Sequence, residues 1–305
     1  MRTMQVLARA VVASALVLTL CCDWFWPDLE PVRLYAKEGH YLCRPVVSSD
    51  GNTMYFLDDS VPFNRVLTIY SCSGALYAYS FVDSSERLLL AGDYHRLALS
   101  DERSLLAVGT LDSVSGEPGI VLVDTSGTVL QMFTIKRPFD RCYFGDVRFA
   151  KSGQRIVYSF WTDPPGYPSR TYFYSKGLVG DTSTSLVREV GWAQRGLDVF
   201  GGDSVYADQM SKYVYPDVNP VNSRWVVFVA DYSGLTGPRF ALHDRRKDKM
   251  VSLGRKSRPP GMYVAWPTWM PNGRDFIFSA GLVSGAGTHW EHPAEIWLLT
   301  DIVDP

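Results

Sequence analysis

The sequence predicts an all-β fold: a β-propeller of about five four-stranded blades, with six as the alternative, closed into a ring by an N-terminal strand. A turn followed by an apolar run recurs five times, its spacing is nearly constant, and each unit holds further strand-like segments. The composition is that of a folded chain, because 46% of the 305 residues are hydrophobic and 20% are charged. Disorder and coiled coils are thereby excluded.

The first 21 residues have the layout of an export signal. Arg2 and Arg9 precede an uncharged apolar stretch over 10–22. A helix of this length rises about 20 Å and the hydrocarbon core is roughly 30 Å thick, so a permanent transmembrane helix is the weaker interpretation. The sequence predicts a signal peptide over 1–21, a tether over 22–30 and a single propeller domain over 31–305.

The segment Leu18-Thr19-Leu20-Cys21-Cys22 resembles the lipobox of bacterial lipoproteins, in which a Cys after a short apolar run becomes the lipidated first residue. Cys22 follows a small residue, and Cys21 has Leu18 three positions before it. The resemblance implies lipidation at Cys22 or Cys21. It also implies export to the bacterial cell envelope, with membrane anchoring on the periplasmic or outer side. A simply cleaved signal and a retained anchor stay open as alternatives.

The recurring turns carry residues that favour positive φ or short side-chain hydrogen bonds, as tight hairpins require. Their anchors are Gly51, Glu102, Gly153, Ser223 and Gly273, so the steps are 51, 51, 70 and 50 residues. Each turn is expected to join the first and second strands of one blade. The longer step leaves about 20 additional residues around 191–212, which are an insertion or part of a degenerate sixth blade.

Two further strands are expected in each unit. The expected third strands are 66–71, 119–124, 170–174, 238–243 and 295–299, and the expected fourth strands are 76–81, 128–135, 185–190 and 249–253. The last unit lacks a fourth strand, and 31–37 precedes the first unit as a strand without a unit of its own. We therefore expect 31–37 to complete the last blade and close the ring.

The turns Ser49-Asp50-Gly51-Asn52 and Met270-Pro271-Asn272-Gly273-Arg274 are similar to the TolB-type β-propeller repeat, a relative of the WD repeat. Glu102 and Ser223 stand where that repeat has glycine. The resemblance covers about residues 43–305 and implies the fold. It says little about activity, because propellers host many functions.

Strand alternation places the second-to-third-strand loops on one face of the ring, which we call the long-loop face. These loops are expected at 58–64, 111–118, 161–169, 231–237 and 280–293. Irregular loops on a rigid scaffold are where binding function concentrates, so we expect a protein partner on this face. The candidate partner-binding residues are Trp161, Tyr167, Tyr232, His289, Trp290 and His292.

No assembled catalytic set is evident in the sequence, so no catalytic residue is assigned. G-x-S-x-G and phosphate-binding or dinucleotide motifs are absent, and the adjacent Asp58 and Asp59 are expected to point apart. His289 and His292 lack a zinc-site spacing, so we expect no metal and no cofactor. The net charge of −2 provides no basic field, so no nucleic-acid partner is expected.

Three cysteines follow the leader, namely Cys43, Cys72 and Cys142. Cys43 and Cys142 are expected on inner strands of blades 1 and 3, and Cys72 is expected to end a third strand on the opposite face. These positions exceed the roughly 7 Å Cα separation that a disulfide permits. We expect no intramolecular disulfide.

These observations favour a non-enzymatic envelope lipoprotein that serves as a β-propeller scaffold for protein–protein interaction. Its expected partners are the membrane, through the lipid anchor, and another envelope protein. One alternative is a periplasmic small-ligand receptor or hydrolase-like enzyme that uses the central channel. The other is a structural subunit of an envelope complex.

Overall fold

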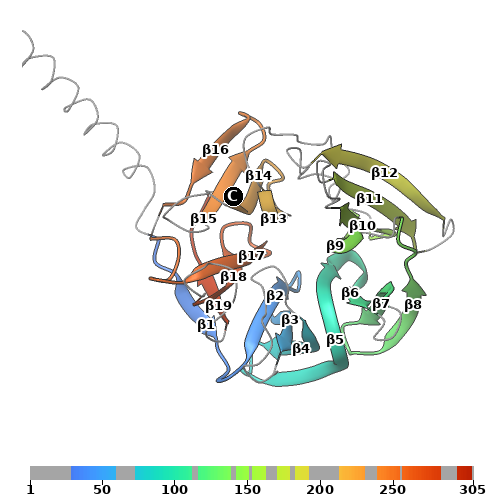
Figure 1. The fold of residues 1–305 in the computed structure, drawn as a ribbon. Helices are drawn as coiled ribbons and strands as arrows, with labels where there is room; N and C mark the ends of the chain where they lie inside the picture. Colours follow the sequence, from blue (N-terminus) through green and yellow to red (C-terminus); the bar gives the residue numbers. More distant parts are fainter. Residues whose placement is uncertain are drawn as a thin grey trace, which may run out of the picture.

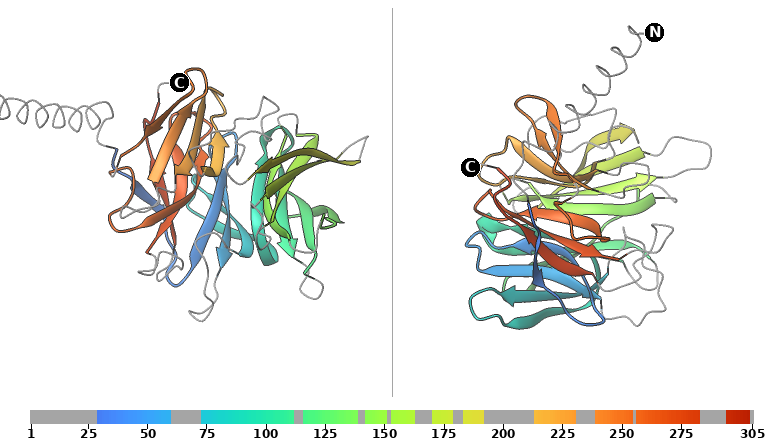
Figure 2. Two further views of the ribbon diagram at one scale, coloured as in Figure 1. Left: turned by 45° about the horizontal axis from the view of Figure 1, so that its top comes forward. Right: turned by 90° about the vertical axis from the view of Figure 1, so that its left-hand side faces the viewer.

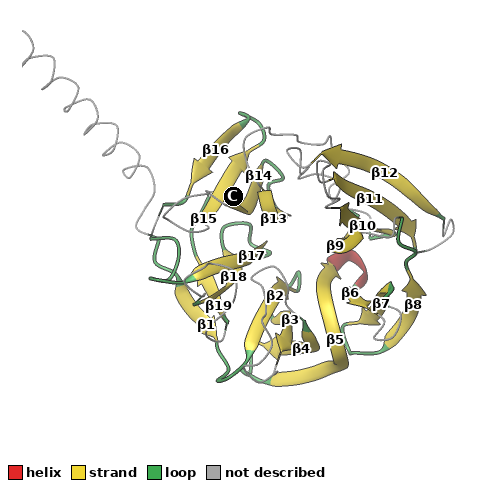
Figure 3. Ribbon diagram, in the orientation of Figure 1, coloured by secondary structure: helices red, strands yellow, loops and turns green. Residues whose placement is uncertain are grey.

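The structure is a computed structural model in which the β-sheets stand as blades around a common centre (Figure 1). It describes residues 29–59, 73–111, 116–138, 142–150, 153–162, 170–178, 183–191, 213–230, 239–254, 256–282 and 294–303. These residues form nineteen strands and one short 3-10 helix, η1 (Asp101–Arg103), which is drawn in red in Figure 3. No helix in these ranges is long and apolar enough to cross a bilayer.

Five blades arise from four sheets, because one seven-stranded sheet holds two blades. Blade 1 contains β2 (Tyr41–Val47), β3 (Thr53–Asp59), β4 (Gly74–Ser80) and the first half of β5 (Glu86–Ser100). Blade 2 contains the second half of β5, β6 (Leu105–Leu111), β7 (Pro118–Asp124) and β8 (Val129–Thr134). Blade 3 contains β9 (Cys142–Phe149), β10 (Arg155–Thr162), β11 (Arg170–Gly177) and β12 (Thr184–Gly191). Blade 4 contains β13 (Tyr213–Val218), β14 (Trp225–Ala230), β15 (Arg239–Asp244) and β16 (Lys249–Ser252). Blade 5 contains β17 (Tyr263–Trp269), β18 (Phe276–Gly281), β19 (Glu295–Leu299) and β1 (Val32–Tyr35).

The N-terminal strand closes the ring, as the sequence predicts. β1 is antiparallel to β19, with Val32 opposite Leu298 and Arg33 opposite Trp297. Blade 5 is therefore built from both ends of the propeller. This pairing covers an edge of β19 that would otherwise present unpaired backbone groups.

Blade 1 differs from the expected strand order. The segment 66–71, expected as its third strand, lies outside the described residues, and the third strand is β4. The fourth strand is the first half of β5, which pairs with β4 and then, beyond Gly92, with β6. Register shifts in both pairings bend this strand, so that it passes from one blade to the next. One strand therefore serves two blades.

All five predicted anchors lie in first-to-second-strand turns. Side-chain oxygens stabilise three of them: Asp50 accepts from the Asn52 amide at 3.0 Å, Asn222 from Arg224 at 3.2 Å and Asn272 from Arg274 at 2.9 Å. Glu102 lies in η1, where a 3-10 turn replaces the glycine hairpin. These connections contain four to six residues, whereas the second-to-third-strand connections on the opposite face contain six to fourteen. Figure 2 shows the blades from two further directions.

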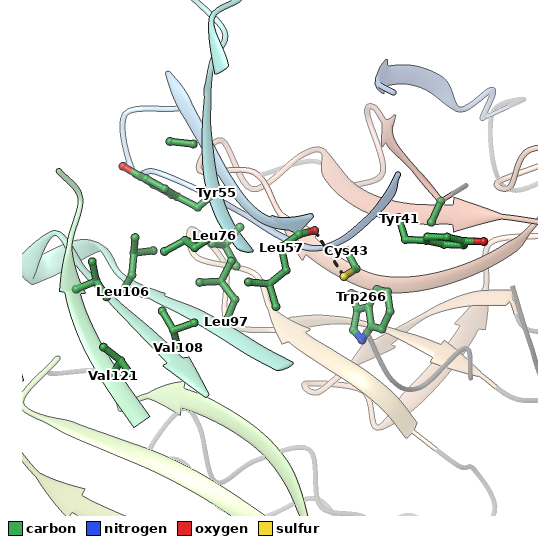
Figure 4. Close-up of a cluster of buried hydrophobic side chains, with 14 of the residues drawn as sticks. Tyr41, Cys43, Tyr55, Leu57, Leu76, Leu97, Leu106, Val108, Val121 and Trp266 are labelled. Carbon is green, nitrogen blue, oxygen red and sulfur yellow. Dashed lines mark hydrogen bonds between the residues drawn. The ribbon is translucent and has the colours of Figure 1, made fainter. Parts of the chain in front are cut away.

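The hydrophobic core lies between the blades. One cluster, drawn in Figure 4, joins blades 5, 1 and 2 and includes Leu57, Leu76, Leu106 and Trp266. Other clusters join blades 2 and 3, blades 4 and 5, and blades 1 and 5. No cluster of the described residues contains side chains from both blade 3 and blade 4.

The expectation of no intramolecular disulfide is wrong, because Cys43 is disulfide-bonded. Cys142 is buried and free, so the partner lies outside the described residues. The expectation relied on a third strand over 66–71. The third strand is instead β4, which begins at Gly74, at the same end of the sheet as β2, the strand of Cys43. Cys72 lies outside the described residues.

Candidate functional site

Every inner strand carries a bulge. In blades 1, 3, 4 and 5 two inner-strand residues lie opposite one residue of the second strand, and in blade 2 His95 is the additional residue. The paired bulge residues are Arg44-Pro45, Gly145-Asp146, Tyr215-Pro216 and Trp266-Pro267. Proline lacks an N–H for the ladder and is tolerated at such interruptions. Arg44 and Trp266 have φ values of 54° and 51°, so the backbone is held in the left-handed region at two of the bulges.

An ion pair between two bulges crosses the centre of the ring. Nη1 of Arg44, in blade 1, donates to Oδ1 of Asp146, in blade 3, at 3.1 Å. Blade 2 lies between these two blades in the ring (Figure 1), so the pair joins blades that are not neighbours. The Arg44 side chain is only 5% exposed, and its guanidinium carbon also lies 5.3 Å from the ring centre of Trp266 in blade 5.

Blades 3, 4 and 5 are joined through Arg148. Nε of Arg148 lies 3.5 Å from Asp146, and Nη1 lies 3.8 Å from Asp217 of blade 4. Asp217 in turn accepts the backbone N–H of Trp269 at 2.9 Å, and its backbone carbonyl accepts the Trp269 indole N–H at 3.1 Å. Among the described residues blades 3 and 4 share no hydrophobic cluster, and the Arg148–Asp217 pair is a polar contact between them.

Arg96 connects blade 2 to the same site. Its guanidinium donates to the carbonyl of Gly145, in the bulge of blade 3, and to the carbonyl of the adjacent Phe144 at 2.8 Å. The side chains of all five blades are thus connected. We call Arg44, Arg96, Asp146, Arg148 and Asp217 the central polar network.

The arginines keep Asp146 ionised. Burial raises the pKa of this carboxyl, but the positive charges of Arg148, Arg44 and Arg96 outweigh it and hold the pKa below its ordinary value. A carboxylate that is ionised and paired at neutral pH is a poor proton donor. With three arginines and two aspartates, the network has one net positive charge, and its ion pairs link residues of different blades. Its chemistry suits joining blades better than turning over a substrate.

The residues predicted from sequence to bind a partner lie outside this network. Tyr167, Tyr232, His289, Trp290 and His292 lie outside the described residues, as do Cys21 and Cys22. The backbone of Trp161 lies in β10 opposite Tyr143 and Thr171, and its side chain is outside the description. Glu295, which follows these loop residues at the start of β19, is paired with Arg33 at 3.4 Å.

Asp58 and Asp59 have separate partners, which agrees with the expectation that they point apart. The carboxylate of Asp58 lies 2.9 Å from Lys37 Nζ and 2.7 Å from Nδ1 of His40. Asp59 accepts from Ser73 Oγ at 3.5 Å. The two carboxylates do not form a catalytic pair.

The sequence analysis missed the central polar network. A signal for it existed, since Pro45, Pro216 and Pro267 interrupt runs that otherwise read as inner strands, and a proline within a strand indicates an edge or a bulge. The partners across the ring had no such signal, because Arg44 and Asp146 are 102 residues apart in sequence.

Comparison with known proteins identifies the fold. No protein-family model matches the sequence, and no curated protein matches it. The β-propeller domain of the Trilobed protease from Pyrococcus furiosus aligns at 10% identity and a TM-score of 0.51, over 87% of this chain and 85% of that chain. The WD40 repeats of RRP9 align at 10% identity and a TM-score of 0.52, over 90% of this chain and 97% of that chain. TolB from Acinetobacter baumannii aligns at 13% identity and a TM-score of 0.42, over 84% of this chain and 57% of that chain. The two alignments with TM-scores above 0.5 show that the chain has the β-propeller fold, which agrees with the fold that the repeat implies.

Proposed function

We propose that this protein is a non-enzymatic scaffold that binds another protein through its long-loop face, and that a lipid at Cys22 or Cys21 anchors it in the bacterial cell envelope. The strand order carries this proposal. All five second-to-third-strand connections, 60–73, 112–117, 163–169, 231–238 and 282–294, begin and end on one face, and the short turns occupy the other. Long loops presented together on a rigid frame form a natural binding surface.

The frame itself supports this role. The central polar network connects the blades, and side-chain oxygens of Asp50, Asn222 and Asn272 stabilise the short turns. Because these contacts fix the centre of the ring and the short-turn face, the sequence of the loops on the long-loop face can change without loss of the fold. Rigid presentation lowers the entropy cost of binding a partner.

The disulfide at Cys43 supports export. Structural disulfides persist in oxidising compartments such as the periplasm and are rare in the bacterial cytosol. This agrees with a signal peptide over 1–21, a tether over 22–30 and a propeller from 31.

Site-specific photo-crosslinking in intact cells tests the binding face. Leu111, at the end of β6 on the long-loop face, is 39% exposed, and Val221, in a short turn on the opposite face, is 57% exposed. We expect a discrete adduct with another protein from a photoreactive residue at 111 and none from one at 221. Replacing Trp161, Tyr167 and Trp290 with Ala should abolish it. Equal adducts from both faces would argue against the proposed surface.

Lipidation is tested separately by mass spectrometry of the mature N-terminus. We expect a diacylated or triacylated Cys22 or Cys21 as the first residue, and loss of membrane association when both are changed to Ser. An unacylated mature N-terminus downstream of Cys22 would contradict the anchor without affecting the binding face.

A small-ligand receptor is the second candidate, because the central polar network brings together charged side chains from four of the five blades. A ligand there has to compete with the Arg44–Asp146 and Arg148–Asp217 pairs. A rise in melting temperature with a member of a sugar and peptide panel would favour this function. No rise across the panel would favour the scaffold.

A further inference from the structure

We propose that the short-turn face of blade 4, which lies opposite the long-loop face, rests on the anionic phospholipid surface of the membrane that holds the anchor. The inference rests on the proposed lipid anchor for the orientation of the ring, and it adds a contact surface that the anchor alone does not supply. Two observations carry it, namely where the N-terminal segment joins the ring and which charges lie beside that point.

The N-terminal segment joins the ring at its short-turn face, between blades 4 and 5. β1 begins on this side, because Val32 lies opposite Leu298, near the end of β19 that leads to the short-turn face. Leu29, three residues earlier, is 6% exposed and packs in the cluster that joins blades 4 and 5. Ile302 belongs to the same cluster, and its backbone N–H donates at 2.8 Å to the carbonyl of Arg274 in the short turn of blade 5. The chain is therefore fixed to the ring from residue 29 onwards.

The tether before this point is short. Leu29 is seven residues after Cys22 and eight after Cys21. Even a fully extended chain of that length spans only about 25–29 Å. A strand of seven residues rises about 23 Å, so bringing the long-loop face to the bilayer would use nearly the whole tether. A lipid anchor therefore favours an orientation in which the short-turn face is towards the membrane and the long-loop face is presented to a partner away from it.

A hairpin beside this point carries exposed cations. We call residues 244–249, which connect β15 to β16, the basic hairpin. Arg246, Lys247 and Lys249 are exposed, and none of the three has an ion-pair partner in the part of the chain that the structure describes. Trp225 packs against the cluster that joins blades 4 and 5, and its register partner is Asp244 in the basic hairpin. The exposed cations are therefore held near the start of the tether.

The basic hairpin is ordered by its own carboxylate. Asp244 accepts from Nε of Arg224 at 2.7 Å, and this hydrogen bonding holds the pKa of Asp244 at about 2, so it is ionised at neutral pH. It also accepts the backbone N–H groups of Arg246 at 3.1 Å and Lys247 at 3.2 Å. Five basic residues face two carboxylates, Asp244 and Asp248, which leaves a net charge of +3. The basic residues are Arg224, Arg245, Arg246, Lys247 and Lys249.

The rest of the short-turn face has a different charge. Its exposed turn residues in blades 1 and 2 include Asp50, Asp83 and Glu102, and in blade 5 Arg274 is paired with Asp301 at 2.8 Å. An anionic surface is therefore attracted at blade 4 and repelled at blades 1 and 2. The short tether brings phospholipid headgroups within reach of the basic hairpin, so charge and reach together select the bilayer as the occupant.

Fluorescence quenching of the full chain in vesicles tests the contact. The vesicles contain phosphatidylcholine, phosphatidylglycerol and a lipid with a nitroxide on its headgroup. A genetically encoded fluorescent residue is placed at Val221 or at Leu111, which mark the two faces, and the turn of Val221 touches the basic hairpin because Arg245 donates to the Ser223 carbonyl at 3.1 Å. We expect strong quenching at 221 and little at 111. Quenching at 221 should fall when phosphatidylglycerol is omitted or when NaCl is raised from about 0.1 M to about 0.5 M.

A charge-reversal variant tests the basic hairpin itself. Each basic residue near an anionic bilayer favours the contact about fivefold, so Lys247→Glu, which changes the charge by two, should lower the ratio of docked to undocked protein about 30-fold. Lys136→Glu is the matched control, because Lys136 is an exposed lysine that follows β8 on the side of the long-loop face. It should change the ratio less than about twofold, since a charge more than a Debye length from the bilayer is screened.

Equal quenching at 221 and 111, or equal effects of the two lysine variants, would overturn the inference. Mass spectrometry of the N-terminus of the same preparation separates it from the anchor. An acylated protein without quenching at 221 keeps the anchor and removes the docking surface, and an unacylated protein with quenching at 221 does the reverse. A protein adduct from residue 221 in the crosslinking experiment would assign the basic hairpin to an acidic protein instead.

Discussion

Removing the carboxylate of Asp146 should destabilise the whole ring, because it leaves Arg44 buried without the partner that crosses the centre. Arg44 Nη1 is 3.1 Å from Asp146 Oδ1, and the arginine side chain is only 5% exposed. Breaking a buried ion pair from one side costs about 3–5 kcal/mol. Asp146 is 20% exposed, so water compensates in part and we expect about 3 kcal/mol for Asp146→Ala. That loss corresponds to a melting temperature lower by about 6–12 °C.

A double-mutant cycle, measured by urea unfolding with tryptophan fluorescence, isolates the pair. Arg44→Met should cost less than Asp146→Ala, because Asp146 keeps Arg148 at 3.5 Å. The double variant should cost less than the sum of the single variants by at least about 1 kcal/mol. Arg33→Met is the control, since Arg33 is 61% exposed and its pair with Glu295 should contribute below about 1 kcal/mol.

The pH dependence provides an independent readout of Asp146. Its folded pKa lies below the unfolded value of about 3.9, so the stability it contributes is complete above that pH and is lost as the pH falls through the folded pKa. Asp146→Asn should flatten this acid limb. An Asp146→Ala loss no larger than that of Arg33→Met, or strict additivity in the cycle, would refute the reasoning.

Three other variants probe the blade interfaces, the turns and the disulfide. Phe276 is fully buried, and its ring centre lies 5.0 Å from that of Phe240. Phe276→Ala should therefore lower the free energy of unfolding, measured by urea titration, by about 3–5 kcal/mol. A loss below about 1 kcal/mol would contradict this packing. The hydrogen bond from Arg224 holds the pKa of Asp244 at about 2. The wild-type protein should therefore lose stability as the pH falls from about 4 to about 2, and Asp244→Asn should remove this loss in thermal melts. An unchanged pH profile would count against the pair. Cys43→Ser removes the disulfide, so it should lower the free energy of unfolding by about 2–4 kcal/mol in oxidising buffer. The loss should be much smaller in reducing buffer, where the disulfide of the wild-type protein is also broken. Equal losses in both buffers would indicate a packing effect alone.

The architecture was largely predictable because a propeller repeats one local pattern. The five turn anchors were read correctly, since Gly, Asn and Asp at a tight hairpin reflect backbone requirements within a few residues. The closing role of 31–37 was also predictable. The last unit lacked an outer strand and the N-terminal strand lacked a blade, so pairing the two gives both strands a backbone hydrogen-bonding partner. In blade 1 the prediction of 66–71 and 76–81 as third and fourth strands was wrong, because the third strand is β4 and the fourth is the first half of β5, a long strand that passes into blade 2 through register shifts.

The candidate site was not predictable in the same way. The sequence by itself determined the class of fold, the closing strand and the sorting of connections between two faces, because these follow from period, turn chemistry and strand alternation. The choice between five and six blades was left open by the sequence, and the described residues form five. Only the tertiary structure decided that Arg44 meets Asp146 across the ring, that Arg148 reaches Asp217, and that Cys43 is disulfide-bonded. Such contacts depend on where bulges turn side chains that are far apart in sequence, and a repeat pattern, being local, contains no information about which of them meet.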